Sequence, residues 1–182
     1  MKSFYLQLFA ETDNINQATM VGRSKRIAFM GVGATGTEKF VRMQGFTSMN
    51  EQKSPIEYSR RYVDEDTQRN DVTGYAAGQG FSFDRYSPYS VHQKLAEIID
   101  GEKTGSDTHV TIVTVDLFSE GEAKIARKRT YAVVPDSIGD GTDALIYSGT
   151  FKAISDAEVG TATSADGWMT AAYKVPVAPP AK

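Results

Sequence analysis

The sequence contains no cysteine among its 182 residues. Disulfide frameworks, zinc sites built on thiolates and cysteine nucleophiles are therefore excluded. Histidine is also scarce, because only His92 and His109 are present, so a metal site would depend on carboxylates. No apolar run approaches the roughly 20 residues that a membrane span needs, and the N-terminal stretch from Phe4 to Ala10 is interrupted by Gln7. We expect a protein made inside the cell, with neither a membrane span nor a secretory leader.

An excess of positive charge is missing as well. Lys and Arg total 20 and Asp and Glu total 23, which leaves a net charge of −3. Domains that bind duplex nucleic acid usually carry a basic excess, so this composition argues against that function. At roughly 150 residues per domain, the length predicts a single domain over residues 1–182.

Alternating polar and apolar residues dominate the patterning of the chain and predict a mainly β protein. The clearest segment is the β-branched run from Val110 to Phe118, which places Val113 and Val115 on one face and Ile112 on the other. A turn at 119–122 joins it to an expected antiparallel partner. The predicted strands cover residues 39–49, 110–118, 124–134, 144–154 and 168–173, and residues 160–167 are expected to form a loop of small residues.

One segment predicts a helix. Ser87 is expected to be the N-cap and Pro88 the first helical residue, with Gly101 just after the end. Val91, Leu95, Ile98 and Ile99 recur at helical spacing, which places His92, Gln93, Lys94 and Glu97 on the exposed side. Many strands and one helix predict a β-sandwich or barrel-like domain with a flanking α-helix.

The segment 56–75 combines strand-like ends with a middle that carries many charges of both signs. Burying these charges in the core of an isolated protein would be costly. Loop composition favours a solvated loop, whereas an ordered, charged hairpin arm is a way for one subunit to reach another. Under the second interpretation, the residues expected to contact another subunit are Arg60, Arg61, Tyr62, Asp64, Glu65, Asp66, Arg69 and Asp71.

Two segments resemble motifs for cofactor or metal binding, but the surrounding sequence lacks the elements that these motifs require. Residues 31–36 read G-V-G-A-T-G, but no helix follows them as a dinucleotide-binding fold requires, so we interpret them as an inter-strand loop. The segment 136–143 resembles part of a calcium loop, but Tyr147 stands where the bidentate glutamate belongs. No catalytic, cofactor-binding or metal-binding residue is predicted, and we expect the protein not to be an enzyme.

Four stretches together resemble the major tail protein, or tail tube protein, of long-tailed bacteriophages. They are the charged hairpin with its exit (58–65 and 71–75), F-S-F-D at 81–84 leading into the helix, K-R-T-Y-A-V-V-P at 128–135, and Y-S-G-T-F-K-A at 147–153. The likeness runs from about Phe40 to about Phe151 and rests on structural rather than chemical motifs.

The resemblance implies a structural virion protein that forms hexameric rings, stacked into a tube through which the genome passes. It implies that strands of each subunit combine into a continuous inner barrel, and that the hairpin contacts the neighbouring ring. The implied partners are other copies of the chain, a tape-measure protein, tail-tip and terminator proteins, and viral DNA that passes without specific binding. No cofactor and no membrane are implied, and the implied locations are the virion tail and, during assembly, the host cytoplasm. On this interpretation the single domain has an extended N-terminal segment (about 1–25), a hairpin arm (about 56–75) and a Pro-rich C-terminal tail (about 174–182).

A tube that conducts a polyanion has to avoid phosphate contacts, so we expect an acidic or neutral lumen. A lumen lined by Arg127, Lys128 and Arg129 would contradict this. Two other functions stay open: a β-sandwich module that binds a carbohydrate or protein ligand on Trp168, Tyr86 and Tyr89, and a small enzyme that uses the glycine-rich loop.

Overall fold

The computed structural model describes residues 20–34, 36–139 and 141–175. This part of the chain is mainly β, with one α-helix, α1 (Ser90–Asp100), and the short 3₁₀ helices η2 (Arg23–Lys25) and η3 (Gly105–Thr108). The strands are β1 (Arg26–Val32), β2 (Lys39–Arg42), β3 (Phe46–Gln52), β4 (Pro55–Arg60), β5 (Arg69–Tyr75), β6 (Gly78–Asp84), β7 (His109–Asp116), β8 (Lys124–Ile138), β9 (Ile146–Ala153), β10 (Glu158–Thr163) and β11 (Thr170–Lys174).

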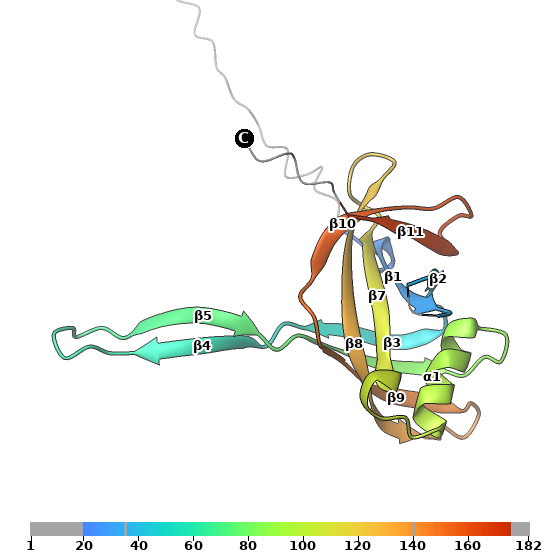
Figure 1. Cartoon of the computed structure of the whole chain (residues 1–182), viewed down its shortest axis with the longest axis horizontal. Coiled ribbons are helices and arrows are strands. Elements are labelled where there is room, and N and C mark those ends of the chain that lie inside the picture. The colour runs from blue at the N-terminus through green and yellow to red at the C-terminus, as the bar shows by residue number, and fades with distance from the viewer. Residues whose placement is uncertain (1–19, 35, 140, 176–182) are drawn as a thin grey trace, which may run out of the picture.

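Six antiparallel strands close into a barrel within the one chain. The order of hydrogen-bonded neighbours is β10-β11-β2-β1-β7-β8, and a further pairing of β8 with β10 completes the ring. Closure satisfies the edges of these strands internally. The expected barrel-like domain with a flanking helix is confirmed (Figure 1).

The long strand β8 links the barrel to the rest of the sheet. It has 15 residues; its first part, around Ala126, pairs with β10, and its second part, from Tyr131 onward, pairs with β9. From β9 the sheet continues through β6 to β3, where it ends. A second curved wall therefore extends from the barrel, with α1 beside it (Figure 1).

Two hydrophobic cores share the central strands β1 and β7. Ile27 and Phe29 of β1 face the barrel interior with Val113 and Val115 of β7. The alternate residues of these strands, including Met30, face the second core, which α1 covers. The predicted alternation of β7 is confirmed, and both of its faces are buried because each meets a different core. The second core contains Met30, Met43, Phe81, Phe83, Val91, Leu95, Ala96, Ile98, Ile99, Val110, Ile112, Val133, Tyr147 and Phe151.

Several predicted strand boundaries were wrong. The single strand expected over 39–49 is two strands, β2 and β3, separated at Gly45, whose φ of 73° ends the extended run. Residues 160–163, expected in a loop, belong to β10 and close the barrel. The glycine-rich strand β6 carried no strand prediction.

The helix begins later than predicted. Ser87 is not its N-cap, since the helix starts at Ser90 after Tyr89, with no side-chain cap. His92 was predicted to be exposed and is instead fully buried, and Lys94 is half-buried, with its Nζ donating to the carbonyl of Gly31 at 2.8 Å. Gln93 and Glu97 are exposed as predicted.

None of the helices in the described ranges is long and apolar enough to cross a membrane. The N-terminal segment predicted over about 1–25 lies outside the described residues except for 20–25, and the predicted tail over about 174–182 lies outside them except for 174–175.

Candidate assembly surfaces

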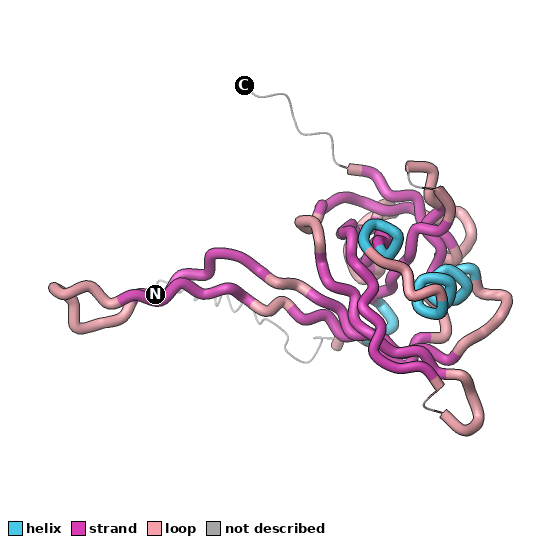
Figure 2. Tube along the Cα trace, turned by 60° about the horizontal axis from the view of Figure 1, so that its bottom comes forward, coloured by secondary structure: helices cyan, strands magenta, loops and turns pink. Residues whose placement is uncertain are grey.

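The segment 56–75 forms the expected hairpin arm, made of β4 and β5. The two strands pair from Pro55 with Tyr75 at the base to Arg60 with Arg69 near the tip. The hairpin projects away from the barrel and its neighbouring wall in two different views (Figures 1 and 2). Every residue of β4 is exposed, so the arm contributes almost nothing to the core. An isolated two-stranded hairpin is at best marginally stable in water, which favours a contact that holds this arm in place.

Charged side chains near the tip of the arm form a small local network. Arg69 donates two hydrogen bonds to the carboxylate of Glu65, and its guanidinium lies 5.5 Å from the ring centre of Tyr62. Arg60 lies 6.0 Å from the same ring and donates to the hydroxyl of Tyr58 at 3.1 Å. Exposed pairs of this kind contribute less than about 1 kcal/mol to stability.

Four of the predicted contact residues stay outside this network. Arg61, Asp64, Asp66 and Asp71 are exposed and form no ion pair within the described part of the chain. The structure thus brings Arg60, Tyr62, Glu65 and Arg69 together and leaves the other four available for a partner.

Apolar side chains on the arm were not among the predicted contact residues, apart from Tyr62. Ile56, Val72 and Tyr75 are more than half exposed, and Val63 at the tip is fully exposed. Exposed apolar side chains are not expected in a solvated loop, whereas they are typical of a surface that another protein covers. The available sequence signal was that Ile56, Val63 and Val72 each stand beside a charged residue.

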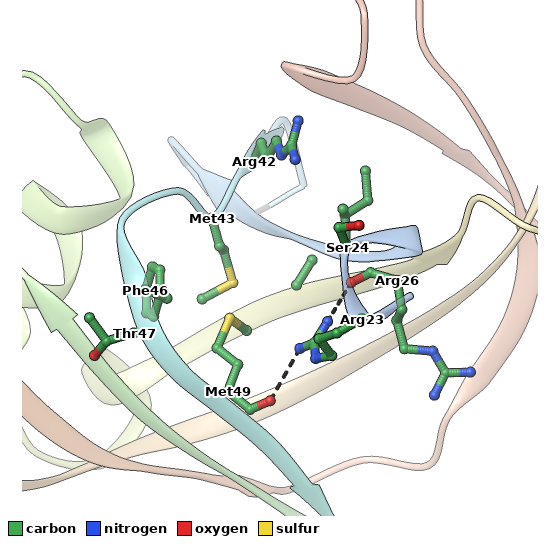
Figure 3. A pocket seen from close by; sticks show the side chains of 10 residues that line it. Arg23, Ser24, Arg26, Arg42, Met43, Phe46, Thr47 and Met49 are labelled. Atoms are coloured by element: carbon green, nitrogen blue, oxygen red, sulfur yellow. Dashed lines mark hydrogen bonds between the residues drawn. The ribbon is translucent and has the colours of Figure 1, made fainter. Parts of the chain in front are cut away.

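The strand β3 supplies an open edge. It ends the sheet order, and no described strand pairs with its outer side. Beside this edge lies a groove of about 360 Å³ between η2, β1 and β3. Figure 3 shows Arg23 crossing the groove, where its guanidinium donates to the carbonyls of Arg26 at 2.6 Å and Met49 at 3.2 Å. An edge that presents unpaired backbone groups is a template for pairing with another chain.

The outer face of β3, β6, β9 and the second part of β8 is polar but almost uncharged. Cross-strand register places Ser48, Ser82, Ser148 and Ser137 in one row, and the hydroxyls of the last two lie 2.9 Å apart. The next two rows are Asn50, Gly80, Thr150 and Val134, and Gln52, Gly78, Lys152 and Ala132. We call these twelve residues the polar face. It carries Lys152 as its one cation, and sequence reasoning missed it because the pattern exists only across strands.

Basic residues of the stretches 23–26 and 127–129 form ion pairs within the chain. Arg26 and Arg127 both donate to the buried carboxylate of Asp116, at 2.6 Å each. Burial alone would raise the pKa of Asp116, but the hydrogen bonds and charges of the two guanidinium groups outweigh it and leave this pKa below its usual value. Lys128 pairs with Glu158 at 2.6 Å and lies 5.0 Å from the ring centre of Tyr173 at one end of the barrel.

The first two residues of the glycine-rich segment 31–36, Gly31 and Val32, end β1, and the rest of the segment lies between β1 and β2, as expected for an inter-strand loop. Of the aromatic residues proposed as a ligand platform, Trp168 lies against Phe29 with ring centres 6.2 Å apart, and Tyr89 lies 5.2 Å from the ring of His92. Tyr86 is exposed as expected.

No protein-family model matches the sequence, and no curated protein matches it. Among solved structures, the chain is similar to the SPP1 phage tail tube, with a TM-score of 0.57 and 11% sequence identity over 80% of this chain and 81% of that one. A subunit of the anti-feeding prophage baseplate has a TM-score of 0.48 and 8% identity over 78% of this chain and 96% of that one. The SPP1 comparison confirms the resemblance at the level of the fold: the chain has the fold of a phage tail tube protein.

Proposed function

We propose that this chain is the tube-forming subunit of a long phage tail. In this proposal, copies form hexameric rings that stack into a tube, and the tube is the conduit for genome delivery. The observation that carries the proposal is the barrel with its flanking helix and extended wall, a fold shared with the SPP1 tail tube over 80% of the chain. The role is structural, with no chemistry at a catalytic site.

The hairpin arm supports self-association. Its strands expose apolar residues, and its charged residues include four without an ion pair among the described residues. Burying apolar surface supplies affinity, while matched charges select the register of the contact. We propose that the arm bridges to the neighbouring ring, and that the open edge of β3 pairs with a neighbouring subunit so that an inner barrel becomes continuous.

The polar face supports the conduit. Phosphate contacts by Lys and Arg are the source of nonspecific affinity for DNA, and this face carries hydroxyl and amide groups with a single lysine. We propose that the polar face lines the lumen. Arg127 and Lys128 are not among its twelve residues, and both are paired with acidic groups.

Further partners follow from the proposed role. A tube of defined length requires a tape-measure protein, and its two ends require tail-tip and terminator proteins. The proposed locations are the virion tail and, before assembly is complete, the host cytoplasm.

Electron microscopy of the purified protein, as a function of concentration, tests the proposal. We expect rings and tubes, and a strictly monomeric particle at high concentration would contradict the proposal. The variant Arg60→Glu with Arg61→Glu should shorten or abolish tubes, because both cations lie at the exposed end of β4. Its melting temperature should stay within about 2 °C of the wild type, since surface substitutions change stability little.

A matched control reverses two exposed lysines outside the arm, Lys39→Glu with Lys103→Glu. This control should assemble like the wild type. Equal loss of assembly in both double variants would show that net charge, and not the arm, controls elongation.

A further inference from the structure

A cation-rich hollow lies near the base of the hairpin arm, where β3 approaches β1, β7 and β8. It has a volume of about 270 Å³, and its lining includes Arg26, Lys53, Arg127 and Arg129 together with Glu51. We call it the arginine hollow. The lining holds four cations and one anion, and positive charge stays in excess after Asp116, the partner of Arg26 and Arg127, is counted.

Three of the four cations already have partners. Arg26 and Arg127 share Asp116, and Lys53 pairs with Glu51 at 3.0 Å. Arg129 is different, because its Nε atom is buried and has no hydrogen-bond partner within the described residues. Arg129 also lines a second depression at the foot of the arm, beside Gly74 and Tyr75.

A buried N–H donor without a partner is costly, and one that belongs to a charged group more so than one on a neutral group. The group that best satisfies it is a carboxylate, which accepts the parallel hydrogen bonds of the guanidinium fork. The arginine hollow therefore has the charge and the unsatisfied donor that suit an anionic group.

The tip of the arm offers carboxylates of this kind. Asp64 and Asp66 are exposed and form no ion pair among the described residues, whereas Glu65 between them is held by Arg69. The arm cannot fold back on its own base, because β4 has six residues and extends roughly 20 Å at about 3.3 Å per residue. The tip of the same copy therefore cannot meet the arginine hollow, whereas the tip of another copy can.

We infer that the Asp64 and Asp66 carboxylates at the arm tip of one copy bind the arginine hollow of a second copy through Arg129. This inference rests on the proposed function and names the surface that receives the arm. Because tip and receptor are different surfaces of the same chain, the contact is head-to-tail and repeats from copy to copy, as an open polymer requires.

Charge exchange tests the inference. Arg129→Glu, and separately Asp64→Lys with Asp66→Lys, should each raise the protein concentration needed for tube formation by about tenfold or more, because each places like charges at a desolvated contact. The chain that carries all three substitutions restores opposite charges and should assemble within about threefold of the wild-type concentration, as expected when paired substitutions couple. Lys103→Glu, an exposed cation outside the hollow, is the control and should assemble normally.

Thermal unfolding of each monomer shows whether a loss of assembly comes from the contact or from a loss of the fold.

Normal assembly of Arg129→Glu would overturn the inference while leaving the tube function intact. A triple variant that assembles as poorly as the worse of its two parent variants would do the same. Failure of the wild-type chain to assemble would overturn the tube function itself. Arg129-dependent binding of a short DNA duplex to the monomer would also overturn the inference, since the hollow would then be a phosphate site.

Discussion

At the scale of single residues, His92 shows how a tertiary contact changes the role of a side chain. The backbone N–H of Tyr86 donates to Nδ1 at 3.1 Å, and Nε2–H donates to the carbonyl of Gln44 at 2.8 Å. With one ring nitrogen accepting and the other donating, the imidazole is neutral. His92 therefore joins the start of α1 to the turn between β2 and β3, where Gly45 has a φ of 73°.

This arrangement predicts a pH-dependent stability. Burial lowers the pKa of His92 below its ordinary value of 6.5 and outweighs the opposing hydrogen bond to Gln44. The unfolded state then binds more protons than the native state just below pH 6.5, so the free energy of unfolding should fall as the pH drops through this window. Urea unfolding measures the change when it is carried out at about one pH unit above and about one and a half below the ordinary histidine pKa of 6.5, at roughly pH 7.5 and pH 5.

Two variants isolate the contribution of His92. His92→Gln should lose about 1–3 kcal/mol at neutral pH through unsatisfied hydrogen bonds and should show a weaker pH dependence in this window. His109→Gln, which changes the exposed histidine at the start of β7, should keep the wild-type dependence. An unchanged pH profile in His92→Gln would show that other groups control it.

The same residue marks the limit of sequence analysis. Helical spacing correctly identified the apolar stripe of α1, but it placed His92 on the solvent side because the spacing cannot show a loop that packs over that side. The clustering of Phe46 and Phe83 around the imidazole, at 5.5 and 4.4 Å between ring centres, completes its burial. That cluster depends on segments far apart in the chain.

At the scale of elements, strands were predictable where local sequence and tertiary structure agree. The β-branched run of β7 and its partner β8 needed only their own alternation and the turn between them. The strand β6 contains Gly78 and Gly80, which weaken any local strand preference, and is held by neighbours on both sides. Barrel closure through β10 also lies beyond local patterns, since Gly160 is opposite Ala126 across the sheet.

The hairpin arm is the element whose removal best separates folding from assembly. Ser54 and Ala76 already lie together at its base, joined by a backbone hydrogen bond of 2.9 Å. Replacing residues 55–75 by Asn-Gly, a pair that favours tight hairpin turns, should therefore leave the barrel and α1 intact. We expect a melting temperature within about 2 °C of the wild type and no tubes by electron microscopy.

Two other outcomes of this deletion would contradict the prediction. A large fall in melting temperature would mean that the arm supports the fold, in conflict with the exposure of every β4 residue. Tubes of normal length from the shortened chain would remove the arm from assembly altogether.

At the scale of the whole molecule, the two sides of the extended wall have opposite chemistry. One side is apolar and is covered by α1, whereas the other is the polar face. In the proposed tube the polar face turns inward, toward DNA, and the helix turns away from it. The chain contains no natural cysteine, so a single introduced thiol can report on each side.

Asn50 lies on the polar face opposite Gly80, and Glu97 lies on the exposed side of α1. As monomers, the Asn50→Cys and Glu97→Cys variants should both react with a bulky polymer-linked maleimide, because both positions are exposed. In assembled tubes, Glu97→Cys should still react, while Asn50→Cys should be protected from the bulky reagent yet react with a small one that enters the lumen. Protection at Glu97 with free reaction at Asn50 would reverse the orientation of the wall and place the polar face outside. Because Asn50 and Glu97 are both exposed and lie on opposite sides of the wall, the two reactivities together test which surface meets the DNA, independently of what holds the rings together.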